Sequence, residues 1–129
     1  MKKAIHTDNA PAAIGPYSQA VQAGGLVFLS GQIPLVPASM EMVKGDFEAS
    51  AHQVFKNLQA VARAAGGELD DMVRLTVYLT EMEKFPRVNA VMAEYFSKPY
   101  PARAAIGVRE LPKGAEVEVD AIMMLPTGG

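Results

Sequence analysis

The strongest constraint on the fold is one segment of helical periodicity, which is followed by a segment that alternates like a strand. Between Asp46 and Ala65, apolar residues recur at intervals of three and four and form one stripe: Phe47, Ala51, Val54, Leu58, Val61 and Ala65. Asp46 is a suitable N-cap, and Gly66 with Gly67 can end the helix. Residues 72–79 then alternate, with one apolar face: Val73, Leu75, Val77 and Leu79. These patterns predict an amphipathic helix and then a strand.

Further elements surround this pair. Leu26–Ile33 is predicted as a strand, and its first four residues are apolar on both faces. A second helix is expected at about Lys84–Ser97, with Pro86 in its first turn and these residues facing inward: Phe85, Val88, Met92 and Tyr95. The last two strands are expected at Ala102–Val108 and Val117–Leu125. This order predicts an α+β fold, in which a mixed sheet carries two helices on one face.

Two helices cannot cover both faces of such a sheet. Because Leu26–Leu29 is apolar on both faces, something must bury the face that the helices leave open. A second copy of the chain is the simplest cover, so the sequence predicts self-association.

Composition limits the class of protein. At 129 residues the chain is expected to form a single domain, residues 1–129. Twelve basic residues against fourteen acidic ones give a net charge of −2, which argues against a protein that neutralises nucleic-acid phosphates. No apolar run reaches the roughly 20 residues of a membrane span, and the first residues turn polar too early for a secretory signal. Without cysteine no thiolate or disulfide chemistry is expected, and the cytoplasm is the simplest location.

The last two predicted strands carry charge in an unusual setting. Ala102, Ala104 and Ile106 alternate as on a buried strand face, whereas Arg103 shares its own face only with Ala105 and Gly107. The following strand places three acidic residues on one face: Glu116, Glu118 and Asp120. A hairpin closed through residues 109–115 would set Arg103 opposite Asp120 and Glu118 opposite Ala105.

Two interpretations of these charges stay open from the pattern alone. One is a cross-strand ion pair on a solvated face. The other is a binding site, because the small side chains beside Arg103 leave room for a ligand and a guanidinium can hold a carboxylate through two parallel hydrogen bonds. A neighbouring carboxylate such as Glu118 could then orient a water molecule or act as a base.

Several other chemistries have no support in the sequence. His6 and His52 have no second His or Cys at metal-ligand spacing, and both are expected at the surface. No Gly-rich phosphate loop and no Ser–His–Asp set can be identified. An enzyme with this sequence is therefore expected to work without a metal, a cofactor or a covalent nucleophile.

Five motifs in this order resemble the reactive intermediate deaminases, the Rid or YjgF-like family. They are IGPYSQAV (14–21), SGQIPL (30–35), VNAVMAEYF (88–96), PYPARAA (99–105) and LPKGAEVEVDAI (111–122), and the similarity extends over about residues 10–123. The resemblance implies a chorismate-mutase-like fold with a mixed six-stranded sheet, and a homotrimer with three sites in the clefts between subunits. It also implies hydrolysis of 2-imino acids, which are released by dehydratases that use pyridoxal phosphate, to 2-oxo acids and ammonia.

The resemblance also implies roles for individual residues. Arg103 would bind the substrate carboxylate, and Glu118 would position the attacking water. The cleft would be lined by four further residues: Tyr17, Ser30, Gly31 and Asn89. Without the resemblance, these four would be read as an anchoring aromatic, a strand end and a solvated helix residue. Ala105 stands where many relatives have cysteine, and because the implied chemistry uses the main chain there, activity is expected to persist.

Two other functions remain as alternatives. The same cleft could serve a non-catalytic module that senses small carboxylic acids. A ribonuclease or translation inhibitor is disfavoured by the acidic charge balance and by the lack of a basic stripe. The expected partners are therefore small 2-imino or 2-oxo acids and further copies of the chain, with neither nucleic acid nor membrane.

Overall fold

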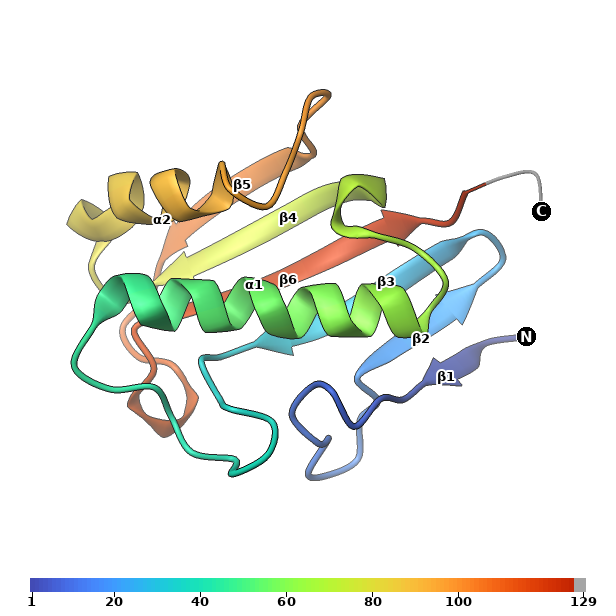
Figure 1. Ribbon diagram of the computed structural model, residues 1–129, viewed down its shortest axis with the longest axis horizontal. Helices are drawn as coiled ribbons and strands as arrows, with labels where there is room; N and C mark the ends of the chain where they lie inside the picture. The colour runs from blue at the N-terminus through green and yellow to red at the C-terminus, as the bar shows by residue number, and fades with distance from the viewer. Residues whose placement is uncertain (127–129) are drawn as a thin grey trace.

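The computed structural model describes residues 1–126 and shows one six-stranded mixed sheet with two helices on one face (Figure 1). The strands are β1 Lys3–Ile5, β2 Ala20–Ala23, β3 Leu26–Gln32, β4 Met72–Leu79, β5 Ala102–Gly107 and β6 Val117–Met124, and they lie in the order β1-β2-β3-β6-β4-β5. The helices are α1 Phe47–Ala64 and α2 Phe85–Met92, with short 3₁₀ turns at Leu69–Asp71 (η1), Met82–Lys84 (η2) and Pro112–Gly114 (η3). The predicted α+β class is confirmed.

Helix α1 forms where its periodicity predicts it and lies across the sheet (Figure 1). The Asp46 side chain accepts a hydrogen bond of 3.2 Å from the backbone N–H of Ala49, which is the predicted N-cap. Gly66 has a φ of +95°, a left-handed conformation that ends the helix and favours glycine. The predicted stripe faces the sheet and fills most of the core on this side.

Helix α2 is shorter than the sequence predicts. It begins after η2 with Pro86 in its first turn, as expected, but it ends at Met92 rather than near Ser97. The backbone N–H groups of Glu94 and Tyr95 bond to carbonyls three residues back, so the chain tightens into turns there. The Ser97 N–H then bonds to Asp70, which directs the chain towards β5.

Strand β4 differs from its predicted pattern in the first two residues. Met72 is buried, whereas Val73 is exposed and not part of the buried face. The pairing with β6 shifts between Met72 and Arg74, and this bulge turns the strand by one residue. The remaining residues of the predicted face, Leu75, Val77 and Leu79, are fully buried.

The predicted hairpin of the last two strands is wrong. β5 pairs in parallel with β4, and β4 in turn pairs antiparallel with β6, so β4 separates the two strands. Arg103 therefore lies beside Leu75, and Asp120 lies beside Thr76. Helix α2 provides the crossover that parallel neighbours require, and burial of the central strand β6 outweighs the small gain from cross-strand charge pairs.

The two faces of the sheet differ in how they are covered. Side chains under α1 and α2 form the core, while the opposite face stays open within one chain. Four apolar side chains on the sheet are 43–50% exposed: Phe28, Val73, Ile106 and Met124. The apolar face of β5 is thus not buried inside the chain. Among residues 1–126, no helix is long and apolar enough to cross a membrane.

Candidate functional site

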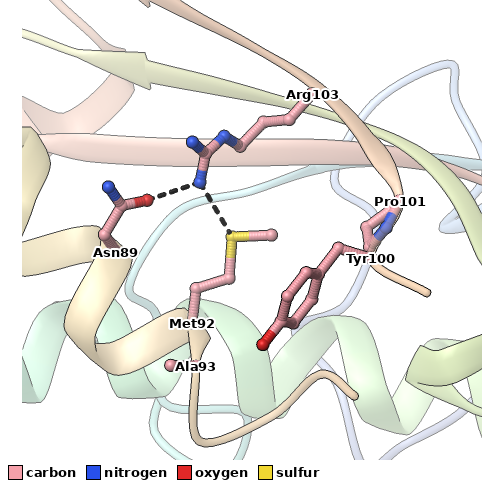
Figure 2. Close-up of a pocket in the computed structure, with 6 residues that line it drawn as sticks. All are labelled: Asn89, Met92, Ala93, Tyr100, Pro101 and Arg103. Atoms are coloured by element: carbon pink, nitrogen blue, oxygen red, sulfur yellow. Dashed lines mark hydrogen bonds between the residues drawn. The ribbon is translucent and has the colours of Figure 1, made fainter. Parts of the chain in front are cut away.

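With the exception of Ala105, the site residues singled out in the sequence fall into two separate pockets. The first, with a volume of about 380 Å³, lies between α2 and the start of β5, and six residues line it: Asn89, Met92, Ala93, Tyr100, Pro101 and Arg103 (Figure 2). The second, of about 610 Å³, contains Tyr17, Ser30, Gly31 and Glu118. We call them the Arg103 pocket and the Glu118 pocket.

Arg103 is held in place by the helix above it. Its guanidinium carbon lies 4.7 Å from the centre of the Phe85 ring, and Nη1 donates to Asn89 Oδ1 and to the Met92 sulfur at 3.7 Å. In Figure 2 the Arg103 guanidinium points towards Asn89 and Met92, and Tyr100 lies on the other side of Met92. Arg103 forms no ion pair with any residue from 1 to 126. The result is an oriented cation that can accept an anionic ligand.

Asn89 positions the side chain of Arg103. Its position on the flank of a predicted helix would by default mean a solvated side chain, and it is exposed. Its carbonyl oxygen nevertheless accepts from Arg103, so Asn89 orients the guanidinium that the sequence pattern singled out.

The Glu118 pocket combines one carboxylate with a mostly apolar wall. Tyr17 is exposed at its edge, and its hydroxyl accepts a long hydrogen bond of 3.4 Å from the backbone N–H of Ile14. Ser30 Oγ donates to the carbonyl of Ser18 at 2.6 Å, which ties β3 to the segment that precedes β2. The apolar wall is formed by Pro11, Ala12, Ile14, Ile33, Leu35, Met40 and Pro112.

Gly31 is required by its contact with Glu118. A Cβ atom on Gly31 would lie 2.0 Å from Glu118 Oε2 and 2.9 Å from the carboxyl carbon. The pairing of β3 with β6 also shifts between Leu29 and Gln32, so Gly31 sits in a bulge. The predicted strand-end pair, Ser30 and Gly31, therefore shapes the space in which the Glu118 carboxylate lies.

Replacing Gly31 by alanine is expected to displace the Glu118 carboxylate without unfolding the protein. The clashing atoms are the far end of a flexible side chain, so the melting temperature should change little. Any activity that depends on Glu118 should fall by about 10- to 100-fold, because misplacing a reacting group by an ångström is costly. Gly25→Ala is the matched control, since a Cβ there meets nothing within 4 Å. Equal activity of both variants would argue against the proposed role of the contact.

The environment of Glu118 favours its protonated form. Burial raises the pKa of the Glu118 carboxyl above its ordinary value of 4.5, and the negative charge of Asp120 adds to the rise. Asp120 lies two residues further along the same strand face and accepts a hydrogen bond of 2.9 Å from the Tyr78 hydroxyl. Glu118 forms no ion pair within residues 1–126. A carboxyl with a raised pKa is suited to accepting a proton.

Arg103 and Glu118 do not meet within one chain. Arg103 shares the helix-covered face with Leu75, whereas Glu118 alternates with the buried Val117 and Val119 and faces the open side. The prediction that they flank each other across a hairpin is therefore wrong. Ala105 lies beside Val77 on the helix-covered face and lines neither pocket.

Sequence reasoning missed several pocket residues. Tyr100 and Pro101 precede Arg103 in the same motif and line its pocket, so their proximity in sequence was a usable signal. Met40 lies in a loop and outside all five motifs, so nothing in the sequence pointed to it as a pocket residue. His52 is partly buried rather than at the surface, with Nδ1 2.9 Å from the Tyr95 hydroxyl. In the described part of the chain, no three His, Cys, Asp or Glu side chains could together hold a metal ion.

The fold is that of a small α+β protein, and Arg103 and Glu118 lie on opposite faces of its one sheet. A sequence model of the Endoribonuclease L-PSP family, which is the Rid or YjgF-like family, matches residues 7–125. The chain belongs to this family, and the resemblance read from its five motifs is confirmed.

Individual relatives carry different names. The chain is 56% identical to protein DfrA of Myxococcus xanthus over 123 residues, which is 94% of each chain. It is 45% identical to a 2-iminobutanoate/2-iminopropanoate deaminase of Dermatophagoides farinae, covering 96% of this chain and 97% of the relative. The solved structure of RidA from Psychrobacter sp. PAMC 21119 has a TM-score of 0.92 at 47% identity and covers 95% of this chain and 99% of that one.

Proposed function

We propose that this protein hydrolyses 2-imino acids to 2-oxo acids and ammonia, at sites completed between the subunits of a homotrimer. The observation that carries the proposal is that Arg103 and Glu118 each lie in a pocket of their own and form no ion pair with residues 1–126. The deaminase name of a relative with 45% identity over nearly the whole chain supports the choice of substrate.

Association of copies accounts for both the divided site and the open face. A substrate bound only to Arg103 would lack a base, and one bound only at Glu118 would lack a carboxylate partner. If the Arg103 pocket of one copy faces the Glu118 pocket of the next, each interface completes one site. The same contact would cover apolar side chains on the open face, including Phe28 and Ile106. A head-to-tail contact forms a ring when its rotation closes, and the proposed ring has three copies.

The reaction needs little from the protein beyond placement and one base. The substrate carboxylate binds Arg103 through two N–H groups, which fixes the iminium carbon C2. As water attacks C2, the new C–O bond forms, the C=N electron pair moves to nitrogen and one water proton passes to Glu118. Glu118 then returns that proton to the amino group. The C–N bond breaks and its electron pair leaves with ammonia, while the hydroxyl of the intermediate gives its proton to Glu118, from which it passes to solvent, as the 2-oxo group forms. Holding the substrate and water in attack geometry supplies much of the acceleration.

A coupled assay tests the proposed function. A threonine dehydratase supplies 2-iminobutanoate, and the protein is expected to raise the rate at which 2-oxobutanoate forms. If 2-oxobutanoate binds by calorimetry but the rate is unchanged, the protein is a binding module instead. RNA binding measured at two salt concentrations completes the test, since strong, salt-sensitive binding would favour the nucleic-acid alternative.

A further inference from the structure

Two residues of the Glu118 pocket have an uncommon backbone conformation. Met40 has a φ of 58° and Lys113 a φ of 57°, and within residues 1–126 they are the two non-glycine residues with positive φ. Both line the Glu118 pocket. Glycine adopts this conformation without steric cost, whereas other side chains rarely do, and such residues cluster at functional sites.

The loop that carries Met40 is held firmly at its base. The Asn57 side chain is buried and donates to the carbonyls of Ile33 and Leu35, at 3.4 and 2.9 Å. The N–H of Val36 donates to the carbonyl of Glu41 at 2.9 Å. The N–H of Met40 donates back to the carbonyl of Val36 at 2.7 Å. The loop is therefore a fixed turn that holds Met40 at the wall of the pocket.

Core packing does not explain why methionine occupies this position. Met40 is neither in the buried core cluster nor among the partly buried side chains packed against it. It belongs to the apolar wall of a pocket of about 610 Å³, which has space well beyond that of a two-carbon side chain. A methionine there presents a flexible, polarizable surface that can adapt to apolar ligands of different shape.

We propose that Met40 forms the far wall of the subsite for the substrate side chain and selects imino acids with long apolar side chains. This inference rests on the proposed function and names its substrate class. A short side chain, such as that of 2-iminobutanoate, leaves Met40 uncontacted. The side chain of the leucine-derived or methionine-derived imine reaches it and gains apolar contact.

The test compares a long and a short substrate in three variants. An L-amino-acid oxidase generates the imines of leucine and 2-aminobutyrate, and kcat/KM is measured for each. Met40→Gly is expected to lower kcat/KM for the leucine-derived imine roughly tenfold, the loss expected from one or two buried methylene contacts, and to leave the shorter imine unchanged. Met40→Leu should retain the preference. Met82→Gly, at an exposed methionine that lines neither pocket, should also retain it.

Calorimetry with the product analogues tests the same inference without catalysis. Met40→Gly should weaken binding of 4-methyl-2-oxopentanoate roughly tenfold relative to 2-oxobutanoate. An unchanged ratio in Met40→Gly, or an equal loss in Met82→Gly, would overturn the role of Met40. Failure of the wild type to accelerate either imine would overturn the proposed function instead, and the binding ratio would still decide the role of Met40.

Discussion

Arg103→Ala is expected to lower kcat/KM for 2-iminobutanoate by roughly 10²–10⁴-fold, the equivalent of two lost charge-assisted hydrogen bonds. Arg103 lies on the edge strand β5, is exposed and forms no ion pair with residues 1–126, so the fold should survive its removal. The coupled assay gives the rate, and a thermal melt shows whether the variant is folded.

Two further variants sharpen this result. Arg103→Lys should be almost as inactive, because an ammonium group cannot bond to Asn89 and hold a carboxylate with a planar pair of donors. Arg63 is an exposed cation on α1 that pairs with Glu68, and Arg63→Ala should behave like the wild type. Full activity of Arg103→Ala would show that the carboxylate is bound elsewhere.

Glu118→Gln is expected to lower kcat by about 10²–10⁴-fold with little change in KM, because the amide keeps the shape of the carboxyl but cannot accept the proton of the attacking water. Steady-state kinetics of the coupled reaction separate the two constants. Glu110→Gln, an exposed carboxylate outside both pockets, is the matched control. A normal kcat in Glu118→Gln would exclude Glu118 as the base.

Glu118→Gln should also be more stable than the wild type at neutral pH. Since the folded state raises the pKa of Glu118, it binds the proton more tightly than the unfolded chain does. The free energy of unfolding that Glu118 contributes is therefore highest at low pH and falls as the pH rises from about 4.5 through the raised value. Denaturant unfolding at pH 4 and pH 8 measures the difference. A glutamine variant that is less stable than the wild type at pH 8 would contradict the assigned environment.

Local patterns predict the elements of this fold well. The stripe of residues 46–65 predicts α1 and its Asp46 cap, and the alternation of residues 72–79 predicts β4 to the residue. Both patterns arise from one buried face, which leaves a regular trace in the sequence. The bulge that exposes Val73 depends on pairing with Met123 and Ile122, about fifty residues away, and leaves no such trace.

Strand order was the main feature that the sequence could not predict. The charges of Arg103, Glu118 and Asp120 favoured a hairpin, yet neighbours in sequence are not always neighbours in a sheet. Insertion of β4 between β5 and β6 also moved Arg103 and Glu118 to opposite faces. The residue types of the candidate site were thus found from the motifs. Their division between two pockets could be seen only once the pairing of the strands was known.

Mixing two inactive variants tests the proposed shared site most directly. Arg103→Ala and Glu118→Gln are purified separately, unfolded, combined in equal amounts and refolded, and native mass spectrometry confirms that mixed oligomers form. Each site between copies needs Arg103 from one copy and Glu118 from its neighbour, and half of the copies supply each residue. The coupled assay should therefore recover about one quarter of wild-type activity. Mixed oligomers that remain as inactive as either parent would contradict a site shared between copies.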